Sequence, residues 1–131
     1  MAEHITFHLV SPERKLASID AKSVLIPGVE GDITLLPNHA DFLTSLRPGI
    51  LVVEDSTTVK EFLVTGGFVE VSDSVATVLA EKAVPKAEAD RTFLGHFIEE
   101  AEVEVGNSTE RQRARADLRL NDLKTLADSL N

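Results

Sequence analysis

The sequence predicts an all-β sandwich or flattened barrel, followed by a C-terminal antiparallel two-helix hairpin. Three observations predict this fold class. Short apolar runs with a two-residue period fill the chain up to residue 85, and pairs of turn-forming residues separate these runs. After Val84-Pro85 the composition changes to Ala, Leu, Glu and Arg with a period of 3.6 residues. Because the residue before a proline disfavours helix, Pro85 marks the boundary. We therefore predict two domains, residues 1–85 and 86–131.

The composition sets limits on the core and on the chemistry. A chain of 131 residues suits one domain with a small appendage and buries roughly two thirds of its unfolded surface. Hydrophobic residues make up 43% of the chain, but Trp and Tyr are absent and Phe occurs six times, so the core must be aliphatic. The absence of Cys excludes disulfides, thiolate nucleophiles and Cys-ligated zinc, and fits a reducing compartment.

The charge argues against two classes of partner. A net charge of −9 disfavours autonomous binding to nucleic acid or to anionic membranes, because both require clustered Lys and Arg. Residues 1–4 have neither a basic region nor an apolar run, and no window approaches the ~18 apolar residues of a membrane span. We expect a soluble chain that is not exported.

The first strand is predicted at residues 5–10, where Ile5, Phe7 and Leu9 alternate with polar residues until Ser11-Pro12. Residues 16–21 and 22–26 follow as further strands that either pair with each other or run on.

Residues 26–49 concentrate turn formers at near-regular intervals. The pairs are Pro27-Gly28, Gly31-Asp32, Pro37-Asn38 and Pro48-Gly49. Each pair favours a reversal between short strands, because Gly allows positive φ, Pro fixes φ, and Asn or Asp forms local side-chain turns. Residues 28–31 lack the Lys-Ser/Thr of a phosphate-binding loop, so we interpret this segment as a turn that displays its side chains.

The remaining β region is predicted from similar signals. Residues 50–53 and 59–64 flank a turn and form a hairpin. Gly66-Gly67 interrupts the next run, residues 68–71 and 75–80 form two more strands, and residues 72–74 turn between them. Eight or more short strands with such frequent turns favour a sandwich or flattened barrel.

Two helices are predicted after Pro85. The first spans residues 88–105, has an apolar face, and stops at residues 106–108. The second begins at Thr109-Glu110, is capped by Asn107 or Ser108, and carries a heptad-like seam. The seam residues are Leu94, Phe97, Ile98, Ala101 and Val105 on the first helix and Ala116, Leu120, Leu123, Ala127 and Leu130 on the second.

The two predicted helices carry opposite net charge. The first has six acidic residues against Arg91, a net of −5, and the second has a net of +1. Opposite charge favours docking, but exposed ion pairs contribute only about 0.2 to 1 kcal/mol each, so the apolar seam must supply most of the stability.

The histidines are candidate metal ligands or catalytic groups. His4 and His8 lie about 13 Å apart along a strand, too far to share a zinc ion whose bonds to nitrogen are about 2 Å long. His39, Asp41 and Thr44 could form a base, an orienting carboxylate and a hydroxyl, but His39 and Asp41 would be about 6 to 7 Å apart in extended chain. We interpret His39 as a turn residue that bonds to backbone or meets a partner.

Two segments resemble the ε subunit of bacterial F-type ATP synthases. Residues 26–49, IPGVEGDITLLPNHADFLTSLRPG, are similar to that family's P-G-x-E-G-x run, P-x-H-A turn and Pro-Gly. Residues 65–71 and 75–83 are similar to its G-G-x-x-E-V and V-T-V-L-A-x-x-A motifs, and the length and order of the parts match from end to end. The chain departs from the pattern at Thr34, where the family usually has Gly, and at Asp41, where it usually has Pro.

The resemblance implies a noncatalytic rotor subunit that needs no cofactor or metal. In the family, the β-sandwich sits on the central stalk beside the γ subunit and touches the c-ring, while the hairpin can extend into the catalytic hexamer and inhibit ATP hydrolysis. The implied location is the cytoplasmic side of the bacterial inner membrane, reached only through the complex.

The resemblance also assigns contact residues. Glu30, Asp32 and His39 match the family's c-ring-facing turns. The second helix matches the inhibitory helix that meets an acidic loop of the catalytic β subunits. Its basic residues are Arg111, Arg113, Arg115, Arg119 and Lys124.

Some family members bind ATP on the folded hairpin through an I/L-D-x-x-R-A motif and arginines of the second helix. Residues 89–94 read ADRTFL, with Phe93 where the motif has Arg. Arg91 points about 200° away from position 93 around a helix. The remaining candidates are Asp90, Arg91, Arg115 and Arg119, and we expect weak nucleotide binding or none.

Two alternatives remain at this point. One is a free-standing protein-interaction module, and the other is a small hydrolase centred on His39 and Asp41.

Overall fold

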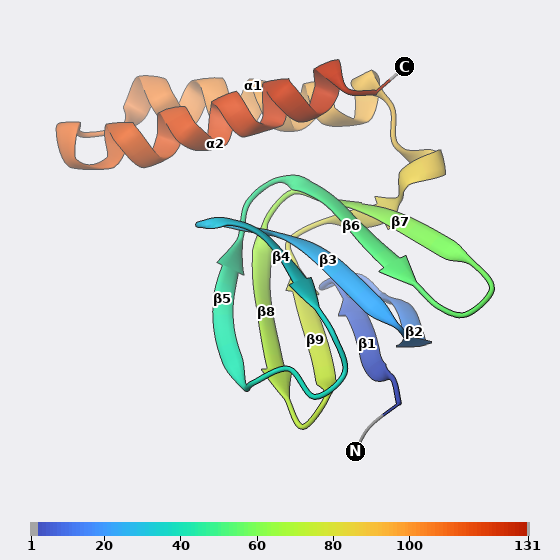
Figure 1. Ribbon diagram of the computed structural model, residues 1–131. Helices are drawn as coiled ribbons and strands as arrows, with labels where there is room; N and C mark the ends of the chain where they lie inside the picture. Colours follow the sequence, from blue (N-terminus) through green and yellow to red (C-terminus); the bar gives the residue numbers. More distant parts are fainter. Residues whose placement is uncertain (1–2, 131) are drawn as a thin grey trace. The chain divides into compact units, whose positions relative to one another are not determined.

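The computed structural model describes residues 3–130, and the chain divides into two compact units, Met1–Lys86 and Ala87–Asn131. Strands form the first unit and two helices form the second (Figure 1). Residues 1–2, part of the N-terminal segment considered above, and residue 131 lie outside the description.

The elements follow the predicted order, strands first and helices last. The strands are β1 (Ile5–Val10), β2 (Lys15–Ala21), β3 (Ser23–Gly28), β4 (Gly31–Leu35), β5 (Phe42–Leu46), β6 (Gly49–Glu54), β7 (Val59–Val64), β8 (Gly67–Ser72), β9 (Val75–Ala80) and β10 (Ala83–Pro85). The helices are the 3-10 helix η1 (Lys86–Glu88), α1 (Arg91–Asn107) and α2 (Glu110–Asp128).

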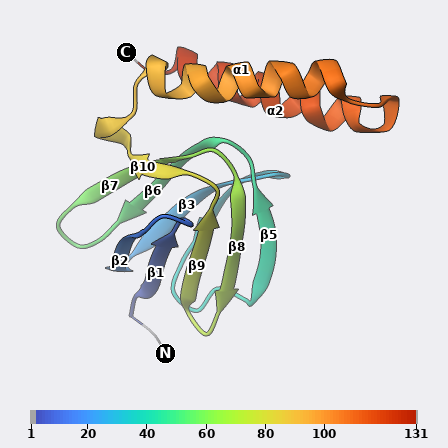
Figure 2. The ribbon, with the colours of Figure 1, turned by 180° about the vertical axis from the view of Figure 1, so that it is seen from behind.

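The strands form one curled sheet with the order β10-β7-β6-β3-β5-β8-β9-β1-β2, and β4 pairs with β3. Figures 1 and 2 show its two sides: β3 and β6 cross in front in the first view, and β9 and β8 in the second. The β1–β9 pair is parallel and the other pairs are antiparallel. The predicted sandwich or flattened barrel is confirmed. Of the two options for residues 16–26, the strands run on, because β2 pairs with β1 and β3 pairs with β4, β5 and β6.

The core of the sandwich is aliphatic, as predicted, apart from Phe7 and Phe62, whose ring centroids are 6.3 Å apart. The buried cluster comprises Ile5, Phe7, Leu9, Ala21, Val24, Ile26, Leu35, Leu46, Leu51, Val53, Phe62, Val64, Val69, Val71, Ala76, Val78, Ala80 and Ala83. Burial of this much aliphatic surface is the main favourable term for the first unit.

Gly67 shows why the predicted interruption at Gly66-Gly67 must be glycine. Its φ is +140°, a conformation that L side chains rarely adopt. A Cβ atom at this position would also lie 2.2 Å from the carbonyl oxygen of Leu79. The start of β8 therefore approaches β9 more closely than any side chain allows.

The β6–β7 turn is organised by Asp55. Its carboxylate accepts hydrogen bonds from the N–H groups of Thr57 (2.8 Å) and Thr58 (2.7 Å) and from both hydroxyls. These bonds, the one from the Thr57 N–H foremost, lower the pKa of Asp55 to about 2. The predicted hairpin at residues 50–64 is confirmed.

The helix boundaries differ from the predicted ones. Residues 86–88 form η1, and α1 begins at Arg91 because the Asp90 carboxylate accepts the Phe93 N–H at 2.7 Å as an N-cap. Residues 106–107 lie inside α1 instead of stopping it, and Ser108 ends the helix by donating its hydroxyl to the Val105 carbonyl at 2.7 Å. The N-cap of α2 is Thr109, so the predicted caps at Asn107 and Ser108 are wrong.

The helices form the predicted antiparallel hairpin, and the predicted seam is partly correct. The buried residues of the second unit are Leu94, Ala101, Ala116, Leu123, Leu126, Ala127 and Leu130. Phe97, Ile98, Val105 and Leu120 are half-buried, and Leu126 lies outside the predicted seam. Neither helix in the described part of the chain is long and apolar enough to span a membrane.

Candidate functional site

The β3–β4 turn displays two of the predicted contact residues. Glu30 is exposed at the tip, and Gly31 has a φ of +135° that closes the turn. Asp32 follows on β4, and its carboxylate pairs with the Arg47 guanidinium at 3.3 Å. This pair offsets part of the negative charge of the turn and leaves Glu30 as its free acidic group.

His39 lies in the β4–β5 loop and bonds to backbone, as predicted. Its Nδ1 donates to the Ala40 carbonyl at 2.7 Å, and its ring packs against Phe42 with centroids 5.0 Å apart. The Asp41 carboxylate instead accepts the Asp73 N–H at 3.1 Å. The base and carboxylate of the hydrolase hypothesis are therefore held by different partners.

The loops at this end of the sandwich are tied together. Asp73 and Ser74 form the β8–β9 turn with φ angles of 51° and 60°, and Asn38 has a φ of 66°. The Asn38 N–H donates to the Ser74 hydroxyl at 2.9 Å, and Asp41 binds the turn from the same loop. Asp41, where the related pattern has Pro, thus acts as an acceptor that fixes the β4–β5 loop on the β8–β9 turn.

The three residues predicted to face one ring do not lie together. Gly28, next to the β3–β4 turn, pairs with Leu46 at the end of β5. His39 precedes the start of β5 at Phe42, whose partner on β8 is Val71. Because four residues of strand span about 13 Å, Glu30 and Asp32 lie at one end of β5 and His39 at the other.

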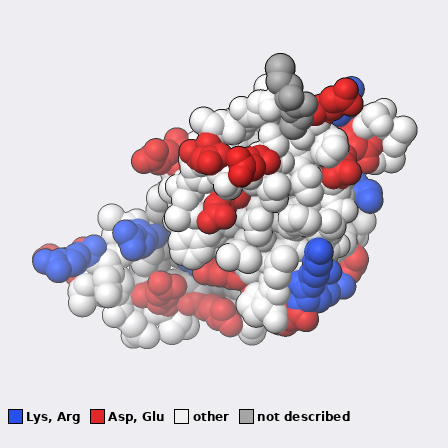
Figure 3. Space-filling view, turned by 90° about the horizontal axis from the view of Figure 1, so that it is seen from below, with Lys and Arg blue, Asp and Glu red and all other residues white. Residues whose placement is uncertain are grey.

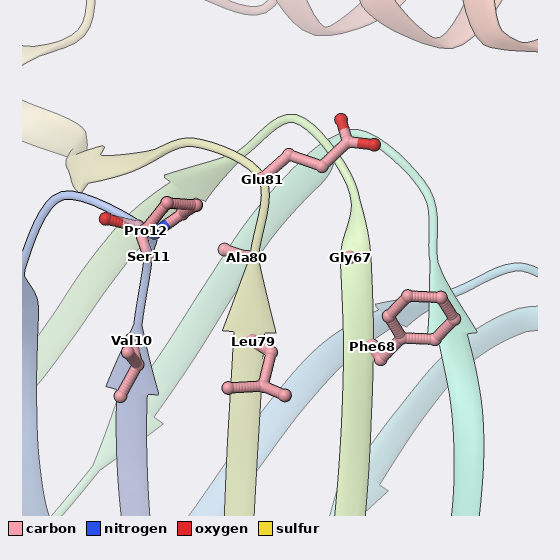
Figure 4. Close-up of a pocket in the computed structure, with 8 residues that line it drawn as sticks. All are labelled: Val10, Ser11, Pro12, Gly67, Phe68, Leu79, Ala80 and Glu81. Carbon is pink, nitrogen blue, oxygen red and sulfur yellow. The ribbon is translucent and has the colours of Figure 1, made fainter.

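An exposed apolar face lies on the outer side of strands β5, β8, β9 and β1. The register places Phe68 opposite Leu79, and Leu79 opposite Val10. Phe68 and Leu79 are each 55% exposed, and Leu43, one row further on, is 68% exposed. A hollow of about 310 Å³ lies beside this row (Figure 4). Contiguous exposed apolar side chains on a sheet of this kind are typical of protein-contact sites.

Sequence reasoning missed this face, although a signal for it was present. Phe68 lies two residues from the polar Glu70 on β8, and Leu79 lies two residues from Thr77 on β9. Since side chains alternate between the two faces of a strand, both apolar residues had to share the outer face with polar ones.

Figure 3 shows the charged side chains at another side of the molecule, seen from below the view of Figure 1. Acidic side chains lie there in separate groups on a largely uncharged surface, and basic side chains form no broad patch in that view.

The basic residues of α2 are mostly exposed. Arg111 and Arg115 line a hollow of about 450 Å³ with Glu104, near the connection between the helices. Arg113 and Lys124 are also exposed, whereas Arg119 is half-buried. The helix therefore presents guanidinium groups to solvent, where an acidic partner can reach them.

The four nucleotide candidates are not brought together. Asp90 caps α1, and the Arg91 Nε donates to the Leu130 carbonyl at 3.5 Å, both at the end of the hairpin where α1 begins. Arg119 and Arg115 lie 11 and 15 residues before Leu130, which is about 16 and 22 Å along α2 at 1.5 Å per residue. These four residues do not form one pocket for ATP.

The fold and its surfaces define a class of protein: an interaction subunit with a β-sandwich and a separate helical hairpin. A family model described as "ATP synthase, Delta/Epsilon chain, beta-sandwich domain" matches residues 4–86. The chain belongs to this family, which confirms the resemblance found in the sequence.

Curated relatives extend the match to the hairpin. The chain is 43% identical to the ATP synthase epsilon chain of Rhodobacter capsulatus over 132 residues, covering 100% of this chain and 99% of that one. It is 52% identical to that of Ruegeria sp. (strain TM1040) over 101 residues, covering 77% and 74%.

Solved structures give the same fold. A chain of the Euglena gracilis mitochondrial ATP synthase, in a structure of OSCP, F1 and c-ring, superposes with a TM-score of 0.75 at 26% identity and covers 100% of this chain and 84% of its own. A chain of the Tetrahymena thermophila central stalk and c-ring structure superposes with a TM-score of 0.65 at 20% identity, covering 93% and 95%.

Proposed function

We propose that this chain is the ε subunit of a bacterial F-type ATP synthase, a noncatalytic rotor subunit that couples the c-ring and the γ subunit to the catalytic hexamer. The match to the Rhodobacter capsulatus epsilon chain supports this most strongly, because it includes both the sandwich and the hairpin. On this proposal the chain is peripheral to the cytoplasmic side of the inner membrane and is held there by the complex.

The apolar face of the sandwich is proposed as the γ-binding surface. Three apolar side chains project from the outer side of the sheet, Leu43, Phe68 and Leu79. They lie outside the buried cluster, so the core of the sandwich does not explain their apolar character. Covering them removes apolar surface from water, which favours association at about 25 cal/mol per Å² before the costs of binding. The polar neighbours Glu70 and Thr77 give the face a hydrophilic border.

A charge placed on this face tests the γ contact. Phe68→Asp should weaken capture of γ by the tagged chain about tenfold or more, because a carboxylate would have to be buried. The matched control is Val59→Asp, which alters a 59% exposed residue of β7 outside this face and should leave capture unchanged. Equal capture by both variants would rule out this surface.

The β3–β4 turn is the first proposed c-ring contact, since acidic side chains suit a basic loop. The loop with His39 is a second proposed contact, and its position at the other end of β5 allows a separate test. The chain has no native Cys, so Glu30→Cys and His39→Cys can each be crosslinked alone in the assembled complex. A turn that gives no crosslink to the c subunit is not a ring contact.

The hairpin is proposed as a conditional brake on ATP hydrolysis. Its exposed arginines, including Arg111, Arg113 and Arg115, offer charge-assisted hydrogen bonds to an acidic loop of the catalytic β subunits when the hairpin extends. In the folded state these groups remain in solvent. Inhibition of ATP hydrolysis on this proposal therefore requires a change from the folded to the extended hairpin, and no change in the sandwich.

The coupling role has its own experiment. Removing the chain from the complex should release the attachment of the c-ring and abolish proton-coupled ATP synthesis, whereas unchanged synthesis would refute coupling. Capture of γ from membranes also separates this proposal from a free-standing interaction module, which would not bind γ. The hydrolase alternative predicts activity that His39→Ala abolishes.

A further inference from the structure

The first residue of α1 is hydrogen-bonded to the segment that follows α2. The Arg91 Nε donates to the carbonyl oxygen of Leu130 at 3.5 Å. The Leu130 side chain is 5% exposed. Past Asp128, Ser129 donates its hydroxyl to the Leu126 carbonyl at 2.6 Å, and the Leu130 N–H donates to the Ala127 carbonyl at 3.1 Å. This extra turn places the Leu130 carbonyl at Arg91.

The charge of Arg91 is unfavourable for its own helix. Arg91 is the first residue of α1, where the helix dipole is positive, and no acidic residue occupies the first turn. The last turn of α2 has no basic residue, although its negative dipole end favours a cation. Arg91 therefore supplies to α2 the cation that α2 lacks, and this cross-helix contact accounts for a residue that local helix rules disfavour.

We propose that Arg91 and Leu130 form a latch that holds the hairpin folded. This inference rests on the proposed function, in which the extended hairpin reaches the catalytic subunits. It adds the contact that opposes extension of the hairpin. Moving α2 away from α1 separates Arg91 from the Leu130 carbonyl and exposes the Leu130 side chain to water.

The proposed latch predicts that loss of the Arg91 charge destabilises the folded hairpin but does not destabilise the helix α1. In Arg91→Gln the cation is lost, so the ratio of extended to folded hairpin should rise roughly two- to fivefold. The helix content of α1 should be kept or increased, because a cation leaves its positive end. Leu130→Ala should raise the same ratio about tenfold or more. Arg91→Lys keeps the charge and should lie between wild type and Arg91→Gln.

Spin labels measure this equilibrium in the full-length chain, alone and in the assembled complex. The chain has no Cys, so labels at Thr92→Cys on α1 and Thr125→Cys on α2, both exposed, report only the distance between the helices. Arg14→Gln, an identical charge change on an exposed residue of the sandwich, is the control. Circular dichroism records helix content for each variant.

The outcomes separate the latch from the brake. Identical distance distributions for Arg91→Gln and Arg14→Gln would overturn the latch, as would a loss of helix content in Arg91→Gln. A shift to long distances supports it. If that shift occurs while ATP hydrolysis by the complex does not fall, the latch stands and the proposed brake is wrong.

Discussion

The sandwich and the hairpin differ in how their cores are built. Strand pairing joins residues far apart in the sequence, such as Phe7 with Ala76, around large aliphatic side chains. In the described part of the second unit, three of the seven buried residues are alanines, namely Ala101, Ala116 and Ala127. Helices in proteins gain most of their stability from packing, so a seam with a high share of alanine makes the hairpin the weaker of the two cores. We propose that the sandwich serves permanent docking and that the hairpin serves switching.

Two glycines test this difference most strongly. Gly67→Ala should destabilise the sandwich by about 4 kcal/mol or more, because the new Cβ would meet the Leu79 carbonyl and φ is positive. Gly95 of α1 has no atom within 4 Å of an ideal Cβ, so Gly95→Ala should stabilise the helix by about 0.5 to 1 kcal/mol. Urea unfolding measures both, and effects of the same sign would contradict the comparison.

Matched leucine truncations test whether the units unfold separately. Leu51 in β6 and Leu123 in α2 are each 0% exposed. Either change to Ala should cost about 3 kcal/mol. Leu51→Ala should lower hydrogen-exchange protection throughout the sheet, and Leu123→Ala should lower it in the helices alone. Loss of sheet protection in Leu123→Ala would show that the hairpin is not an independent switch.

Two carboxylates that accept backbone N–H groups give a smaller effect. Asp41→Ala frees the Asp73 N–H and should cost about 1 kcal/mol, with faster exchange confined to the β4–β5 loop and the β8–β9 turn. Asp90→Ala removes the N-cap of α1 at a similar cost of about 1 kcal/mol, with faster exchange in the first turn of the helix. Unchanged exchange at Asp73 would show that Asp41 does not fix the loop.

The smallest effect concerns pH. The pKa of Asp55 is lowered from its ordinary value of 3.8 to about 2, so its contribution to folding is fully present above pH 3.8 and is lost as the pH falls through about 2. Because the carboxylate lies in a surface turn where solvent screens its charge, the change is slight. Asp55→Asn should flatten the dependence of the unfolding free energy on pH in this window, and parallel curves for the two proteins would contradict the assignment.

The strands could be predicted from the sequence because their signals are local. The period of residues 5–10 and the turn pairs of residues 26–49 act within a few positions. The parallel pairing of β1 with β9 joins residues about 70 positions apart, and no local pattern encodes it. The end of α1 was misplaced because Gly106 has open space around it and is tolerated inside the helix.

The candidate sites were predicted less completely for a similar reason. His39 was correctly interpreted as bonding to backbone, because its loop context is local. The exposed apolar residues Phe68 and Leu79 were missed, although alternation along β8 places Phe68 on the same outer face as Glu70. The Arg91–Leu130 contact joins the two ends of the hairpin and becomes visible only once the helices are paired.

The division of labour between the two units has one direct test. Residues 88–131 are deleted, and the shortened chain is assembled into the complex beside the full-length chain. The account predicts that γ and the c-ring stay attached through the sandwich while the rate of ATP hydrolysis rises. An unchanged rate of hydrolysis, with the shortened chain shown to be bound, would contradict it.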